Sequence, residues 1–285
     1  MNQLERTWLT VDCDDFRHVP AQQGHPTRSK KNLEISTAEL SQQFIAGMEG
    51  FGNWMKSHNH PVTLFVIADL FDSPHFTNWL SELLSTFSLR ITIGCHGLSH
   101  RSWSAWPEDY DGFKQALSEA TKIIKKRVGK NWRPWFRAPG GYIAPWMAKA
   151  IAESGFTVDT SINPSWLVKR KTGEGNDWRK VRESISKADL IEREWLNMWS
   201  LPVNGPALSI FPLSIISKIA WKKLPPILTT QQALEAPSNS EFKLSTVYWH
   251  LLDHGRKNGH WTPPISNKIL VSGETKNTES LKTAN

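Results

Sequence analysis

Short apolar segments alternate with amphipathic helical segments from residue 8 to residue 161, and this alternation limits the fold more than any other feature. Residues 62–68 are almost wholly apolar, as a strand buried on both faces of a parallel sheet should be. Between residues 40 and 55, Leu, Phe, Ile and Met recur at helical spacing. Because strands that alternate with helices form parallel sheets with helical crossovers, the sequence predicts an α/β fold.

The same periodicities locate the individual elements. The expected strands span residues 8–11, 62–68, 90–95, 135–141, 156–161, 199–203 and 246–252. The expected helices span residues 37–58, 76–87, 110–128 and 145–154, and Ser36 or Thr37 is the expected N-cap of the first one. We expect a single domain over residues 1–265 with a long loop at 17–36, an irregular insertion at about 165–245, and a disordered tail at 266–285.

Polar side chains follow most of these strands at the point where the strand ends. In chain order they are Asp12, Asp14, Asp15, His96, His100, Arg137, Asp159 and His250. The carboxyl ends of the strands in a β/α barrel meet on one face, and that face carries the chemistry. The coincidence of so many strand ends with reactive side chains is stronger evidence for a site than any single motif.

The histidine pair indicates a metal site. An HxxxH spacing places His96 and His100 on one face of a helical turn, so both imidazoles can reach one ion. A carboxylate from a separate strand end would complete a His₂Asp set with open positions, which is how hydrolases hold a catalytic zinc; cobalt, manganese or iron also suits these ligands. Strand alternation sends Asp12 and Asp14 to the same side, and Asp15 remains a rival ligand.

Taken in order, five motifs resemble the NodB-homology polysaccharide deacetylases, carbohydrate esterase family 4. The motifs are Thr10-Val11-Asp12-Cys13-Asp14-Asp15, His96 to His100, Arg137-Ala138-Pro139-Gly140-Gly141, Asp159-Thr160-Ser161 and Val247-Tyr248-Trp249-His250. The resemblance spans roughly residues 8–165 and 246–254 and implies a distorted (β/α)7-type barrel. Residues 199–203 and Leu224-Pro225-Pro226 also resemble a cytoplasmic exopolysaccharide-type subgroup of that family.

The resemblance implies zinc-dependent hydrolysis of N-acetyl groups on an amino-sugar-containing saccharide, whether a polysaccharide or a lipid-linked or nucleotide-linked intermediate. Asp14, His96 and His100 would hold the zinc ion. Asp12 would take a proton from water, and Arg137 would pair with Asp12 and orient it.

The remaining motifs supply the other roles that the resemblance implies. The Gly140 N–H would stabilise the oxyanion; this chain has Gly140 where the family has tyrosine, and only the backbone is needed there. His250 would protonate the leaving amine, with Asp159 holding His250 in its charged form. His254 competes with His250 for this role, although His250 lies on the strand proper.

Fifteen tryptophans are an excess, and sugar rings stack on indole faces. Trp103, Trp166 and Tyr142 lie beside the motifs and are the expected substrate-contacting residues, with core packing as the alternative. Two other functions also stay open. One is a metal-dependent amidase acting on a non-sugar amide or cyclic imide, and the other is a catalytically inactive carbohydrate-binding protein.

Charge and hydropathy limit the partners. The chain has a formal charge of +7, but its basic residues form scattered clusters without a nucleic-acid-binding signature, so we expect no nucleic acid partner. We expect a saccharide substrate; the basic clusters are expected to be solvated faces, with an anionic or lipid-linked saccharide as the alternative reason for them. Membrane contact is expected to be at most peripheral, through the apolar residues 205–221. A polar N-terminus and the lack of an apolar run of about 18 residues predict a cytoplasmic protein, whereas the oligomeric state is not predicted.

Overall fold

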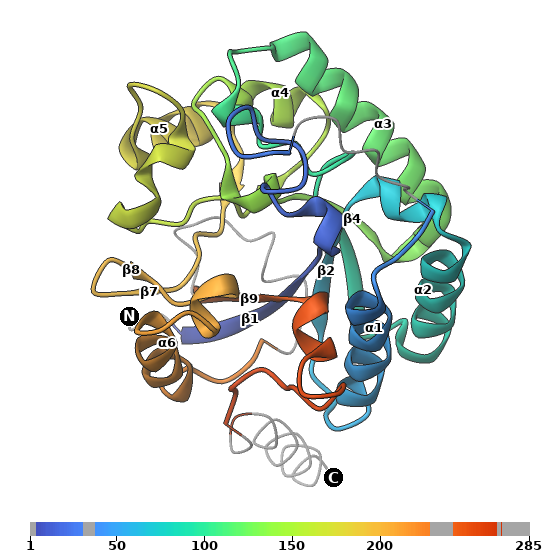
Figure 1. Cartoon of the computed structure of the whole chain (residues 1–285). Coiled ribbons are helices and arrows are strands. Elements are labelled where there is room, and N and C mark those ends of the chain that lie inside the picture. Colours follow the sequence, from blue (N-terminus) through green and yellow to red (C-terminus); the bar gives the residue numbers. More distant parts are fainter. Residues whose placement is uncertain (1–3, 31–37, 229–241, 267–268, 270–285) are drawn as a thin grey trace, which may run out of the picture.

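The computed structural model describes residues 4–30, 38–228, 242–266 and 269. Seven parallel strands form one curled sheet in the spatial order β6-β5-β4-β3-β2-β1-β9 (Figure 1). These strands are β1 (Leu4–Cys13), β2 (Val62–Val66), β3 (Ile91–Cys95), β4 (Trp132–Phe136), β5 (Val158–Asp159), β6 (Ile191–Glu192) and β9 (Phe242–His250). The predicted α/β fold with a distorted seven-stranded β/α barrel is confirmed.

Six α-helices of the described residues surround the curled sheet on its outside (Figure 1). They are α1 (Gln42–Met55), α2 (Pro74–Phe87), α3 (Tyr110–Val128), α4 (Met147–Glu153), α5 (Trp178–Lys187) and α6 (Leu213–Lys222). Every residue of β2 and β3 is buried, as strands covered on both faces require. No helix in the described ranges is both long and apolar enough to cross a membrane.

The two edge strands are joined by the chain that follows β6. Trp195 forms a parallel bridge with Thr246 of β9, and the backbone N–H of Leu196 donates to the Thr246 carbonyl at 2.8 Å. The indole N–H of Trp195 donates to the carbonyl of Thr160 at 2.7 Å. Trp195 therefore connects the two sides of the open sheet and closes the barrel.

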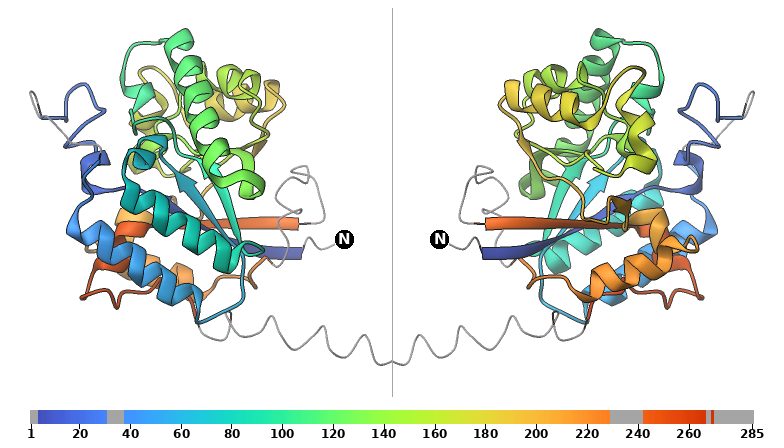
Figure 2. Two further views of the ribbon diagram at one scale, coloured as in Figure 1. Left: turned by 90° about the vertical axis from the view of Figure 1, so that its right-hand side faces the viewer. Right: turned by 90° about the vertical axis from the view of Figure 1, so that its left-hand side faces the viewer.

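The pairing of β1 with β9 sets the position of the site. The two strands run side by side over their whole length in both views of Figure 2, with a register from Leu4 opposite Phe242 to Asp12 opposite His250. Two of the predicted site residues, nearly the whole chain apart in sequence, are thus neighbours at the carboxyl ends of adjacent strands.

Several predicted boundaries are wrong. The first helix begins at Gln42 with Ser41 as its N-cap; the expected caps Ser36 and Thr37 lie outside the described residues. The strand expected at 156–161 is only β5, and the one at 199–203 is β8 (Leu201–Pro202), paired antiparallel with β7 (Asn197–Met198) outside the barrel. The irregular insertion expected at about 165–245 contains β6 and α6 in its described part, and residues 229–241 lie outside the described residues. The expected tail at 266–285 falls almost wholly outside the described residues.

The histidine pair does not lie on a helical turn. Residues 96–102 form a loop between β3 and the short 3₁₀ helix Trp103–Ala105, and His100 has a left-handed φ of 57°. The HxxxH spacing therefore brings the two rings together through a turn of the loop, with ring centroids 5.0 Å apart, and not through helical periodicity.

Helix α1 packs closely against the 3₁₀ helix Leu251–Gly255 that follows β9, and glycine allows this approach. A methyl group on Gly47 would lie 2.5 Å from the carbonyl oxygen of Leu251, whereas one on Gly52 of the same helix would meet nothing within 4 Å.

We expect Gly47→Ala to lower the free energy of unfolding by about 1–3 kcal/mol through overpacking. Gly52→Ala, the matched control, should raise it by up to about 1 kcal/mol because alanine favours helix.

Urea unfolding followed by circular dichroism checks this pair of variants. Equal urea midpoints for Gly47→Ala and Gly52→Ala would contradict the conclusion that the close contact between α1 and the 3₁₀ helix Leu251–Gly255 requires glycine at position 47.

Candidate active site and metal centre

Three predicted ligands converge at the carboxyl ends of β1 and β3. Asp14, His96 and His100 each offer a ligand atom, and the three atoms all lie within 4.8 Å of one another. The Asp14 carboxylate oxygens lie 3.4 Å from His96 Nε2 and 3.2 Å from His100 Nε2. All three residues are buried, and no other group of three such ligands occurs in the described ranges.

The donor atoms of this group fit a divalent cation. Asp14 Oδ1, His96 Nε2 and His100 Nε2 are buried without hydrogen-bond partners among the described residues. His96 Nδ1–H donates to the carbonyl of Arg137 at 2.8 Å, which leaves the lone pair of Nε2 directed at Asp14. A buried polar atom without a partner costs about 1–3 kcal/mol, and a cation would satisfy all three at once.

The charge states also favour cation binding. Burial alone would raise the pKa of Asp14, but the adjacent His100 and His96 hold it well below its usual value. Burial lowers the pKa of His96 despite the nearby Asp12 and Asp14. Burial alone would lower the pKa of His100 as well, but Asp14 raises it. The group therefore presents an ionised carboxylate and one neutral imidazole, and a cation would take the place of the proton that Asp14 favours on His100.

Asp12 lies beside this group and forms a buried ion pair with Arg137. Arg137 Nη1 donates to Asp12 Oδ1 at 2.6 Å, and Arg137 Nη2 donates to Thr10 Oγ1 at 2.9 Å. Arg137 is fully buried, with its guanidinium carbon 4.3 Å from the ring centroid of Phe65. The second Asp12 oxygen lies 3.9 Å from His96 Nε2, so Asp12 faces the metal-ligand group while Arg137 holds its other side.

Asp159 was expected to hold His250, and the structure places it elsewhere. Its carboxylate accepts hydrogen bonds from the backbone N–H and the hydroxyl of Ser161, and the Ser161 oxygen accepts from the N–H of Ala138 at 2.8 Å. Burial raises the pKa of Asp159, and burial and the Asp159 carboxyl raise that of Glu192. Asp159 therefore supports the turn that carries Gly140 and does not contact His250.

The carboxylate beside His250 is Asp253, which sequence reasoning missed. His250 Nδ1 lies 3.5 Å from Asp253 Oδ2, and His250 Nε2 lies 3.8 Å from Asp14 Oδ2. Burial alone would lower the pKa of His250, but Asp253 and the charge of Asp14 raise it to about 9. The spacing of three residues, which puts Asp253 in the turn that directly follows the strand, was the signal that could have identified it.

The two rival residues have structural partners instead. Asp15 caps the short helix Phe16–His18 and accepts hydrogen bonds from the backbone and hydroxyl of Ser41. His254 is fully buried, accepts from the Trp249 indole at 2.9 Å and bonds to the Trp261 carbonyl through Nδ1. Burial lowers the pKa of His254 to about 4, so it remains a neutral core residue at physiological pH.

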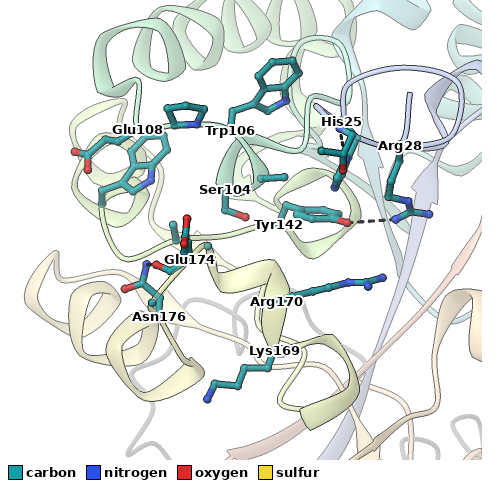
Figure 3. A pocket seen from close by; sticks show the side chains of 17 residues that line it. His25, Arg28, Ser104, Trp106, Glu108, Tyr142, Lys169, Arg170, Glu174 and Asn176 are labelled. Atoms are coloured by element: carbon teal, nitrogen blue, oxygen red, sulfur yellow. Dashed lines mark hydrogen bonds between the residues drawn. The ribbon is translucent and has the colours of Figure 1, made fainter. Parts of the chain in front are cut away.

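The expected substrate-contacting residues have different environments. Trp103 is buried, with Phe113 5.3 Å away and the guanidinium carbon of Arg101 4.5 Å from its ring, so it has no open face for a sugar and that prediction is wrong. Trp166 is 65% exposed. Tyr142 is buried beside Gly140, and its hydroxyl reaches the wall of a cavity (Figure 3).

Gly140, the expected oxyanion donor, lies in the tight turn Pro139–Gly141 with a φ of 58°. The ammonium group of Lys171 donates to its carbonyl oxygen at 2.6 Å. Lys171 is a second residue that sequence reasoning missed, because it lies in the 3₁₀ helix Trp166–Thr172, 31 residues further along the chain, with no motif around it.

Residues 48–158 match the family model for polysaccharide deacetylase. The matched segment runs from α1 to β5 and carries His96, His100 and Arg137, but not Asp12, Asp14 or His250. The match covers less than half of the chain and shows that this segment is similar to the polysaccharide deacetylase family. No curated protein matches the chain in a sequence search.

Comparison with solved structures supports the fold. A structure from Mycobacterium smegmatis, described as a "putative polysaccharide deacetylase", has a TM-score of 0.54 at 15% identity over 91% of this chain and 81% of that one. The 4-alpha-glucanotransferase from Thermococcus litoralis gives a TM-score of 0.48 at 11% identity over 91% and 35% of the two chains. The chitin deacetylase from Colletotrichum lindemuthianum gives 0.37 at 9% identity over 68% and 88%. The last two likenesses are too weak to add to the assignment.

Proposed function

We propose that this chain is a metal-dependent hydrolase that removes N-acetyl groups from an amino-sugar-containing saccharide. The observation that carries the proposal is the set of three buried ligand atoms without partners, on Asp14, His96 and His100, facing the Asp12–Arg137 ion pair. The family match over residues 48–158 supports deacetylation as the reaction. Zinc as the ion and a cytoplasmic exopolysaccharide-type context rest on the sequence motifs alone.

Asp14, His96 and His100 would hold the cation. When bound, a divalent cation polarises a carbonyl and makes a water molecule more acidic, which is the chemistry that amide hydrolysis needs at neutral pH. Asp12 is the proposed general base because it faces the ligand group from the side. Arg137 fixes the orientation of Asp12, since its buried guanidinium donates to both Asp12 and Thr10 on the same strand.

The other side of the site would stabilise the products of attack. The Gly140 N–H is the proposed donor to the oxyanion, and its turn is held by Ser161 on one side and Lys171 on the other. His250 is the proposed general acid for the leaving nitrogen. Its protonated form is favoured by Asp253, so it can carry the proton that a neutral amine product requires.

Two substitutions separate metal binding from proton transfer. We expect Asp14→Asn to lose zinc binding, because the ionised ligand is removed. Asp12→Asn should retain zinc, which also reports that the variant is folded, but lower the rate of acetate release about 10²–10⁴-fold. Asp72→Asn, an exposed carboxylate in the 3₁₀ helix Ala68–Asp72, is the matched control and should change neither property.

Zinc stoichiometry and acetate release from a panel of N-acetylated saccharides measure these effects. If the zinc-loaded wild type released no acetate from any member of the panel, the deacetylase proposal would fail. If Asp12→Asn released acetate at the wild-type rate, Asp12 would not be the base.

The role of His250 can be tested by comparing two substrates, one whose leaving group must be protonated and one whose leaving group need not be. We expect His250→Gln to lower kcat about 10²–10³-fold on an N-acetyl sugar, because an amine must be protonated as it leaves. The same variant should hydrolyse 4-nitrophenyl acetate at nearly the wild-type rate, since a nitrophenolate leaves without a proton. His260→Gln, an exposed histidine, serves as the control.

Equal losses on the amide and on the ester would contradict general-acid catalysis. They would assign His250 a role in holding Asp14.

A further inference from the structure

A cavity of about 1010 Å³ lies beside the candidate active site. Four loops form its wall: residues 25–28 follow β1, 104–108 follow β3, 142–146 follow β4 and 169–176 follow β5. All four leave the carboxyl ends of strands, so the cavity opens on the face that carries the metal ligands. A substrate that extends beyond the reacting sugar would enter this space.

Cations gather at one end of the cavity. Figure 3 shows Arg28 and Arg170 on the side of Tyr142, with Glu108 and Glu174 on the opposite side. Arg28 donates to the Tyr142 hydroxyl at 3.3 Å. Lys171 does not line the cavity, but its ammonium group lies 5.3 Å from the centroid of the Tyr142 ring that does. We call Arg28 and Arg170, with Lys171 behind them, the cationic end.

The charges of the exposed Arg28 and Arg170 act on the groups beside them. Burial, together with Arg28 and Arg170, lowers the pKa of Lys171 to about 8. Burial, Arg28 and Arg170 also lower the pKa of His25. No carboxylate acts on either group, and none of the three cations forms an ion pair within the described ranges. A bound anion would offset these positive charges.

The cationic end is also the end nearest the reacting centre. The Lys171 ammonium group bonds to the Gly140 carbonyl, and the ring of Tyr142 packs against Gly140. On the other side, Gly24, which precedes the loop at 25–28, contacts the backbone of His100.

We propose that the cationic end of the cavity is a subsite for an anionic group, a phosphate or a carboxylate, on the saccharide substrate. This inference rests on the proposed function for its substrate class, since the sugar carrying the anion is the one deacetylated next to it. The half-buried Trp106 supplies apolar surface for the ring that carries the charge, and the buried Tyr142 also lines the cavity.

Direct binding tests the subsite without relying on turnover. Isothermal titration calorimetry with zinc-loaded protein would compare N-acetylglucosamine 1-phosphate, glucuronic acid and neutral N-acetylglucosamine. We expect Arg28→Gln/Arg170→Gln to weaken binding of at least one anionic sugar tenfold or more and to leave neutral N-acetylglucosamine unchanged. Lys125→Gln/Lys126→Gln on the outer face of α3 removes the same charge elsewhere and should behave as wild type.

The anionic sugar whose binding weakens in Arg28→Gln/Arg170→Gln identifies the recognised group as phosphate or carboxylate. An unchanged preference for anionic over neutral sugars in Arg28→Gln/Arg170→Gln would overturn the subsite. Arginine-dependent binding without acetate release would keep the subsite and reject the proposed reaction, so the two failures are distinguishable.

A second, independent feature lies on the β7–β8 hairpin and α6. Of the nine exposed large hydrophobic side chains in the described residues, five fall on one short stretch, so their clustering requires an explanation. We call them the apolar patch: Trp199, Ile210, Phe211, Ile215 and Ile219. Trp199 occupies the β7–β8 turn, and α6 packs against both strands of this hairpin (Figure 1).

The charged residues of the segment that carries the apolar patch have one sign. Residues 195–228 contain no Asp or Glu, and the three lysines of this stretch, Lys218, Lys222 and Lys223, are all exposed on or beside α6. Ile215 and Ile219 are one helical turn apart and face outward, while Ser217, Ala220 and Trp221 face the core. An outward apolar stripe on a helix whose only charged residues are lysines is the pattern of helices that lie at a lipid surface.

The apolar patch reaches the rim of the active site. Ser209, directly before Ile210, accepts a hydrogen bond from Arg256, and Arg256 pairs with Asp253 at 2.9 Å. We infer that the apolar patch docks on an anionic lipid bilayer, which would hold the rim near the membrane surface.

Vesicle co-sedimentation tests the docking. We expect wild type to sediment with phosphatidylcholine vesicles that contain phosphatidylglycerol, less with pure phosphatidylcholine, and less at high salt. Phe211→Ser/Ile215→Ser should reduce binding tenfold or more. Leu89→Ser, at a side chain that is 94% exposed but far from the patch, is the matched control and should bind as wild type.

Equal binding by the patch variant and the control would overturn the inference, as would no binding of wild type to anionic vesicles. A wild-type dimer that becomes monomeric in Phe211→Ser/Ile215→Ser, without vesicle binding, would assign the patch to a second copy of the chain instead.

Discussion

The buried ion pair between Arg137 and Asp12 is the interaction on which the rest of the site depends. Arg137 enters from the end of β4 and crosses the interior of the barrel to Asp12 and Thr10 on β1, while its Nε donates to the Thr160 carbonyl beyond β5. One guanidinium thus joins three strand ends. Loss of one partner from such a buried pair typically costs about 3–5 kcal/mol, because the other charge stays unpaired. Asp12, the proposed base, can face the metal-ligand group with one carboxylate oxygen because Arg137 holds the other.

Around that pair the charges are separated in space. Asp12, Asp14 and Asp253 lie at the centre with the histidines, whereas Lys171 and the arginines of the cavity stand beyond the turn of Gly140. The centre is suited to a cation and a proton donor, and the outer region to an anion. This arrangement keeps each group beside the charge that its proposed role requires.

The strand-end motifs could be predicted from sequence, because each one is local. A strand followed by a turn rich in Asp, His or Arg places those side chains on one face whatever the packing elsewhere. Asp12, Asp14, His96, His100, Arg137 and His250 accordingly lie together. Boundaries were less predictable: β5 and β6 are two residues each, too short for any periodicity, and the histidine loop takes its shape from a left-handed residue that no spacing rule reveals.

What the sequence by itself determined is therefore the parallel α/β architecture and the residues that meet at one rim, since these follow from hydrophobic periodicity and strand direction. Only the tertiary structure decided which of these residues touch. Asp253 replaced Asp159 beside His250, Asp15 became a helix cap, and Trp103 entered the core. The partner of a side chain depends on the register between strands and on how loops close over the rim. Those are set by contacts between segments far apart in the chain, which local patterns do not encode.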